Sequence, residues 1–307
     1  MKLKKIMGNW NRFFYQDIPI DGLAYFRIFL GFIILMTFLS DIANASLWWS
    51  DEGFHSLTTA KQSLQFFHFN LFEFLPPSLN SLYFLIGLKL IVLVCFILGF
   101  QTRIANFLLI LLILSFHQRN FFILNSADLL LRSFLLILLF SPCGNIYSLD
   151  AYFAKKKGHE KKHITSAWTY RLLQLQISCV YLSTAIAKTK GELWLDGSAV
   201  YYATRLEDLT RFWLPLILDN YFSIKLLTWG TLIIEFSLGL LVWIKELRKP
   251  IIILGILFHL GIEWTMSIPT FEVLMLISLP LMLGPHQIKI YLDFCKEKVK
   301  PYVTRTR

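Results

Sequence analysis

An all-α fold is predicted for this sequence: a polytopic transmembrane helix bundle of about eight spans, with no soluble domain. Hydrophobic residues make up 56% of the 307 residues and charged residues only 16%, against about 25% in an ordinary soluble domain. The apolar residues are gathered in long blocks, several of which reach the roughly 20 residues that a helix needs to cross a bilayer. The third observation is the distribution of charge. Most Lys and Arg residues lie between these apolar blocks, as is typical of the loops that connect transmembrane helices.

Eight helices are expected in the order in which the apolar blocks occur. Their approximate ranges are 21–43, 80–100, 103–117, 126–143, 167–187, 224–244, 250–267 and 270–285. The first block follows a basic N-terminus, as in a signal peptide, but it is long and lacks a clear small-residue cleavage site, so we take it as a retained span. The sequence thus divides into a transmembrane domain, residues 1–285, and a basic tail, residues 286–307.

The distribution of Lys and Arg predicts the orientation. With the N-terminus inside, 19 of these residues fall in inside segments and 7 in outside segments. This bias places both termini in the cytoplasm. The net charge of +10 comes largely from juxtamembrane clusters, which contact anionic lipid headgroups, so nucleic acid is excluded as a partner.

Several ionisable residues lie where hydrocarbon is expected, and each needs a partner or a function. Asn125 and Asp128 open the fourth helix as a cap, and Arg132 is four residues from Asp128, so the two can pair. A structural cap and ion pair explains these three residues; the alternative is a role in binding. Arg27 is expected to extend to the interface.

Glu235 has no cation three or four residues away on its own helix. Its partner must come from another helix, or the carboxyl group stays protonated. His259 faces a similar choice between a hydrogen bond to another helix and a ligand role, and Glu263, four residues on, could hold it. No group of residues has metal-ligand spacing, and no cysteine pair has CxxC spacing, so neither a metal nor a disulfide framework is expected.

Lys188 lies at the end of the fifth helix, in the segment Ala187–Gly197, AKTKGELWLDG. It can be an interfacial anchor beside Trp194. Alternatively, it lies in the outer mouth of the bundle, where desolvation lowers the pKa of the amine and makes it a usable base. On the second view Lys190, Glu192 and Asp196 lie near water, Gly191 ends the helix in a left-handed conformation, and Trp194 and Trp213 cover the mouth.

Five segments in this order carry a resemblance to a known family: FRIFLG, LGFQTRI, RNFFILNSADLLLRSFLLILLFSPCGNIYSLD, AKTKGELWLDG and FHLGIEWTMSIPTFEVLML. Together they resemble the HTTM domain, the membrane module of the vitamin K-dependent gamma-carboxylase family, over residues from about 15 to 285. In that family a reduced vitamin K is oxidised by oxygen, and a peptide glutamate is carboxylated.

The resemblance implies roles for individual residues. Its register puts the catalytic lysine on Lys188 and a family histidine on His259, and the cofactor that it implies is a reduced, vitamin K-like quinone. Ala127 stands where carboxylases carry a helix-four histidine, and the large outer domain of the carboxylases has no counterpart. We therefore expect no true peptide carboxylation. The LNSADLLLR pattern is that of the bacterial branch, so the bacterial inner membrane is the expected location.

Two functions remain open from the sequence. The first is an enzyme-like membrane protein that binds a lipid-soluble quinol, with Lys188 and His259 as catalytic residues and Trp194, Glu235, Asn125, Asp128 and Arg132 around the cofactor. The second is a non-enzymatic maturation, export or immunity partner of a small secreted peptide, as in sporulation-delaying toxin systems. A transporter is less well supported, because no inverted repeat is visible.

Overall fold

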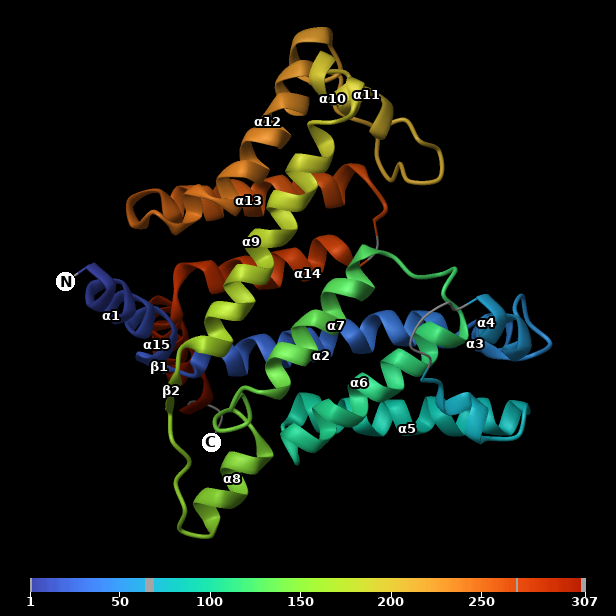
Figure 1. Ribbon diagram of the computed structural model, residues 1–307, viewed down its shortest axis with the longest axis vertical. Helices are drawn as coiled ribbons and strands as arrows, with labels where there is room; N and C mark the ends of the chain where they lie inside the picture. The colour runs from blue at the N-terminus through green and yellow to red at the C-terminus, as the bar shows by residue number, and fades with distance from the viewer. Residues whose placement is uncertain (1, 64–68, 269, 305–307) are drawn as a thin grey trace. The chain divides into compact units, whose positions relative to one another are not determined.

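The structure, a computed structural model, describes residues 2–63, 69–268 and 270–304 and is predominantly helical (Figure 1). The chain forms two compact units, one made of residues 17–169 and the other of residues 1–16 and 170–307. The first unit carries the only sheet among the described residues, a two-stranded antiparallel ribbon in which β1 (Asp17–Pro19) pairs with β2 (Ile164–Ser166).

The unit of residues 17–169 is built around four helices. The helix α5 packs against α2 and α6, and α7 packs against α6 and α2 (Figure 1). The bounds of these helices are α2 Asp21–Ile42, α5 Leu79–Leu98, α6 Thr102–Arg119 and α7 Ser126–Leu139. Shorter elements connect them: α3 Ala45–Trp49, α4 Leu57–Ser63, η1 Leu71–Phe74 and α8 Leu149–Lys156.

Local chemistry fixes the ends of these helices. The Ser78 side chain accepts a hydrogen bond from Ser81 N at the start of α5, and Gly99 ends the helix in the left-handed conformation, with φ +68°. Gly99 is also required for space, because a Cβ there would lie 2.1 Å from Arg27 Nη1. Arg27 is fully buried and donates to Tyr147 O at 2.6 Å. Arg27 therefore does not reach solvent, because its guanidinium is buried and holds the loop that follows α7; its extension to the membrane interface stays a prediction.

The second unit packs α13 against both α12 and α14, and α9 is tied to the same group by hydrogen bonds. Tyr170 Oη and Gln174 Nε2 of α9 both donate to Leu281 O, at 2.7 and 2.8 Å. Its elements are α1 Lys2–Tyr15, α9 Trp168–Lys188, α10 Glu192–Asp196, α11 Ala199–Ala203, α12 Tyr221–Gly239, η2 Leu241–Trp243, α13 Lys245–Thr265, α14 Phe271–Ser278, η3 Leu279–Leu283 and α15 Pro285–Thr304.

Three helices of the described residues are long and apolar enough to cross a membrane: α2, α5 and α12. A fourth span is obtained if Phe271–Leu283 and Pro285–Lys298, which meet at 107°, count as one broken span. The other expected spans fall short because α7 has only 14 residues, because α6 and α13 carry charged residues near both ends, and because α9 has polar side chains along its length. The count of eight spans is not confirmed and stays a prediction.

Candidate functional site

Lys188, the last residue of α9, forms an ion pair with Glu235 of α12. Lys188 Nζ donates to Glu235 Oε1 at 2.6 Å, and the side chains are 24% and 7% exposed. The ring of Trp194, from α10, lies 5.3 Å from the same Nζ and contributes a cation–π contact. Three of the residues predicted from the sequence therefore lie together, and the partner that Glu235 lacked on its own helix is Lys188.

The chain after Lys188 turns sharply to bring Trp194 back over the lysine. Gly191 N donates to Lys188 O, and Gly191 then begins α10 with φ −93°. The expected left-handed Gly191 is wrong, since the helix ends three residues earlier; the left-handed residue is Gly197, with φ +86°. A Cβ on Gly197 would lie 2.8 Å from Lys225 Cγ, so this turn packs tightly on α12.

The exposure of the charged residues around Lys188 agrees with the sequence-based expectation. Lys190, Glu192 and Asp196 are exposed, whereas Lys188 is half-buried. Trp213 differs from the expectation, because it is 73% exposed and therefore does not cover a buried mouth in this structure.

Glu235 is the most unusual residue of this site. It is 5% exposed, and its second oxygen, Oε2, is buried and has no hydrogen-bond partner among the described residues. Buried polar atoms are nearly always hydrogen-bonded, because an unpaired one costs about 1–3 kcal/mol. Glu235 therefore combines an ion pair on one oxygen with a second oxygen that accepts no hydrogen bond from the described residues, although the Thr184 hydroxyl group, which donates to Val180 O and Tyr181 O, lies close to the carboxylate.

His259 belongs to a buried three-residue network that joins α9, α13 and α14. Its Nε2 lies 2.7 Å from Tyr181 Oη, and its Nδ1 is hydrogen-bonded to Glu272. The expected partner Glu263 is bound instead by Arg211, because Glu263 lies near the half-exposed end of α13, whereas His259 faces α14. Both ring nitrogens are thus engaged by protein groups, so His259 positions helices around Glu235, with which it interacts electrostatically.

Asn125, Asp128 and Arg132 lie in the other unit, at the start of α7. Asn125 and Asp128 form a capping box, with Asn125 Oδ1 accepting from Ala127 N and Asp128 Oδ2 from Asn125 N. Among the described residues Asp128 forms no ion pair with the Arg132 side chain; its Oδ1 lies 3.5 Å from His117 Nε2, a contact with a neutral imidazole because burial lowers the pKa of His117 well below its ordinary value. This arrangement is that of a structural cap.

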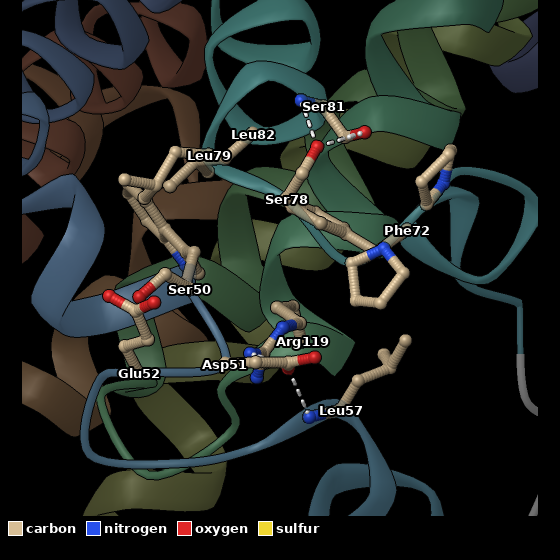
Figure 2. Close-up of a pocket in the computed structure, with 13 residues that line it drawn as sticks. Ser50, Asp51, Glu52, Leu57, Phe72, Ser78, Leu79, Ser81, Leu82 and Arg119 are labelled. Carbon is tan, nitrogen blue, oxygen red and sulfur yellow. Dashed lines mark hydrogen bonds and ion pairs between the residues drawn. The ribbon is translucent and has the colours of Figure 1, made fainter.

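A pocket of about 100 Å³ in the unit of residues 17–169 was not anticipated from the sequence. Figure 2 shows Ser78 and Ser81 at one end of it and Arg119, Asp51 and Leu57 at the other. Arg119 is 1% exposed and donates to Asp51 Oδ1 at 2.9 Å, while Asp51 also accepts from Leu57 N. The sequence signal for this pair is an arginine that follows an apolar block by three residues.

Comparison with known proteins gives a family match, and the curated proteins similar to the chain include two from Bacillus subtilis. The HTTM domain matches residues 15–286. The chain is 26% identical over 155 residues to the sporulation-delaying protein SdpB of Bacillus subtilis (strain 168), covering 48% of this chain and 47% of that one. It is 25% identical over 132 residues to the uncharacterized protein YitO of the same organism, covering 40% and 41%. The chain thus spans less than half the length of these relatives, and no solved structure matches it.

Proposed function

The chain belongs to the HTTM domain family, and from this premise we propose that it is an enzyme-like membrane protein whose Lys188–Glu235 pair acts on a lipid-soluble quinol. The observation that carries the proposal is the pair itself: a close, half-buried ammonium and carboxylate with one carboxylate oxygen left free. Ionisable groups are expensive among apolar helices and are retained where they have a task.

The residues present fit a reduced quinone. Glu235 Oε2 is a buried acceptor without a donor, and a phenolic hydroxyl group is a donor that would satisfy it. The indole ring of Trp194 beside Lys188 offers an aromatic surface for a flat ring. When bound, a quinol supplies two electrons and the protons of its hydroxyl groups.

The chain's own contribution is to hold and move a proton. Transfer from Lys188 Nζ to Glu235 Oε1, 2.6 Å away, leaves a neutral amine, which is the form that a general base requires. Return of the proton restores the ion pair. Tyr181, His259 and Glu272 keep α9, α13 and α14 in register, so His259 has a positioning role in this scheme.

The test compares Lys188→Ala and Glu235→Gln with the matched control Lys190→Ala, two positions away and exposed. Purified proteins in lipid nanodiscs are titrated with menadiol, and binding is followed by quenching of tryptophan fluorescence and turnover by oxygen uptake. Glu235→Gln is expected to weaken binding about tenfold, Lys188→Ala to abolish turnover, and Lys190→Ala to change little. Unchanged turnover in Lys188→Ala, or its loss from the membrane, would leave Lys188 as an anchor only.

A second candidate is a membrane partner in the maturation, export or immunity of a small secreted peptide. The similarity to a sporulation-delaying protein favours it. In the native host, mass spectrometry of culture supernatants from the wild type and a deletion strain would show whether a secreted peptide is lost. If the Lys188→Ala protein restored that peptide, the second candidate would replace the first.

A further inference from the structure

Two adjoining cavities lie in the unit of residues 17–169, where α5 ends and α6 begins. Their volumes are about 340 and 510 Å³, and both are lined by Asp150 and Lys161. The first cavity also includes Arg103, and the second includes Lys157 and His159. The two cavities together form a continuous basic site around Lys161.

The one carboxylate in this site is already occupied. Asp150 Oδ1 accepts from Gln101 N at 2.8 Å, and Oδ2 accepts from Thr102 N at 2.9 Å and from Thr102 Oγ1 at 2.7 Å. Lys161 Nζ is 4.0 Å from Asp150 and 3.4 Å from Gly144 O, which leaves it with donor capacity because an ammonium has three donors. The site therefore offers cationic groups in excess over a carboxylate that is engaged in capping.

The site lies at the end of a helix that is long and apolar enough to cross a membrane, which favours a position at the membrane–water boundary. The helix α5 is one of the helices apolar enough to span a membrane, and it ends at Leu98, directly before the cavity residue Phe100. Phe100 and Phe153 line the second cavity and are 42% and 43% exposed, and Tyr152 on the same short helix α8 is 61% exposed. Exposed aromatic side chains next to lysines are typical of segments that lie at lipid headgroups.

We propose that these cavities bind the phosphate-bearing headgroup of an anionic membrane lipid, with Lys157, Lys161 and Arg103 around the phosphate and Phe100 and Phe153 against the glycerol and upper acyl chains. Charge complementarity selects an anion, and the aromatic side favours an amphiphile over a free phosphate. This site is separate from the Lys188–Glu235 pair, so the proposal stands or fails independently of the proposed quinol activity.

The test uses two double variants that each remove two positive charges from residues 155–161. Lys157→Gln with Lys161→Gln alters the cavities, whereas Lys155→Gln with Lys156→Gln alters neighbouring lysines that line neither cavity. The full chain in detergent is titrated with phosphatidylglycerol or phosphatidylcholine, and bound lipid is counted by native mass spectrometry. We expect phosphatidylglycerol to bind more tightly, and the cavity pair to lose at least about fivefold more affinity than the control pair.

Further controls separate a loss of lipid binding from unfolding and from binding of free phosphate. Circular dichroism verifies folding, and the single variant Lys157→Gln, at an exposed position, serves if the double variant unfolds. Equal losses of affinity for phosphatidylglycerol in the two double variants would contradict the proposed site, because they would show that the lipid binds to the basic surface in general. Displacement of phosphatidylglycerol by inorganic phosphate at the same concentration would show that the site binds free phosphate and does not select a lipid headgroup.

Discussion

Lys89 is a buried cation that lies in the middle of α5. It is 5% exposed, and its Nζ lies 3.6 and 4.5 Å from the ring centroids of Phe38 and Phe116. Within the described residues it forms no hydrogen bond or ion pair, so two aromatic rings are its nearest partners, and the carboxylates of Asp41 and Asp128 attract it from a longer distance. A desolvated cation–π contact stabilises by about 2 kcal/mol. A charge at the centre of a membrane costs at least ~2.5–3.5 kcal/mol, so the contact does not fully offset the cost of burying the ammonium group.

Lys89→Met is therefore expected to raise the stability of the protein. Methionine fills a similar volume and packs well against aromatic rings, so we expect a gain of about 1 kcal/mol. The apparent Tm in detergent measures it, with Lys89→Arg, which keeps the charge, as the control. A lower Tm for Lys89→Met than for the wild type would show that the ammonium itself stabilises the fold.

At the scale of elements, α6 is capped from a distant part of the chain. Gln101 takes a left-handed conformation, with φ 46°, and its side chain does not cap the helix. Asp150, 48 residues beyond Thr102, supplies the acceptors instead. Burial by itself would raise the pKa of Asp150, but the hydrogen bonds from Thr102 and Gln101 and the charge of Lys161 outweigh it, so the pKa lies below its ordinary value of 3.8.

Asp150→Asn is expected to lower the free energy of unfolding by about 1 kcal/mol at neutral pH, as the loss of a cap does. Folding lowers the pKa of Asp150. The carboxylate therefore contributes fully to the free energy of unfolding at pH values above the pKa of the unfolded chain, and this contribution is lost as the pH falls through the pKa of the folded protein. Apparent Tm values of the variant and the wild type should thus differ at neutral pH and converge in acid. A constant difference at all pH values would contradict the assignment, and Asp208→Asn, at an exposed position, controls for charge.

The topology of the whole chain depends on which helices cross the membrane. The charge bias predicts both termini in the cytoplasm of a bacterial cell, with α9 crossing between the basic loop and Lys190. The helix α9 does not meet the criteria of length and hydropathy that α2, α5 and α12 meet. Its interior polar groups, such as Gln174 and Ser178, are buried and hydrogen-bonded to other parts of the protein, which is the condition under which a polar helix can span.

Cysteine labelling decides this point. In a background without the four native cysteines, Lys156→Cys is expected to react with a membrane-impermeant maleimide only after the cells are opened, and Lys190→Cys in intact cells. Both positions are exposed, so accessibility to the reagent does not limit either reaction. Reaction of both cysteines from the same side of the membrane would show that α9 does not cross it, and the predicted number of spans would then be too high.

The sequence by itself determined the features that depend on neighbours within one or two helical turns. Hydropathy located the long apolar helices but missed α1 and α15, which lie in the basic N-terminus and tail. The Asn125–Asp128 spacing predicted the capping box, and the end of the apolar block at Ile186 separated half-buried Lys188 from exposed Lys190. Only the tertiary structure decided which distant groups meet. Glu235 lies 47 residues beyond Lys188, Glu272 rather than the nearer Glu263 holds His259, and Asp150 caps a helix that starts 48 residues before it. The periodicity of the sequence shows which side of a helix is apolar. The partner of a buried charge, however, depends on how separate helices pack together, and the spacing of residues along the chain does not contain that information.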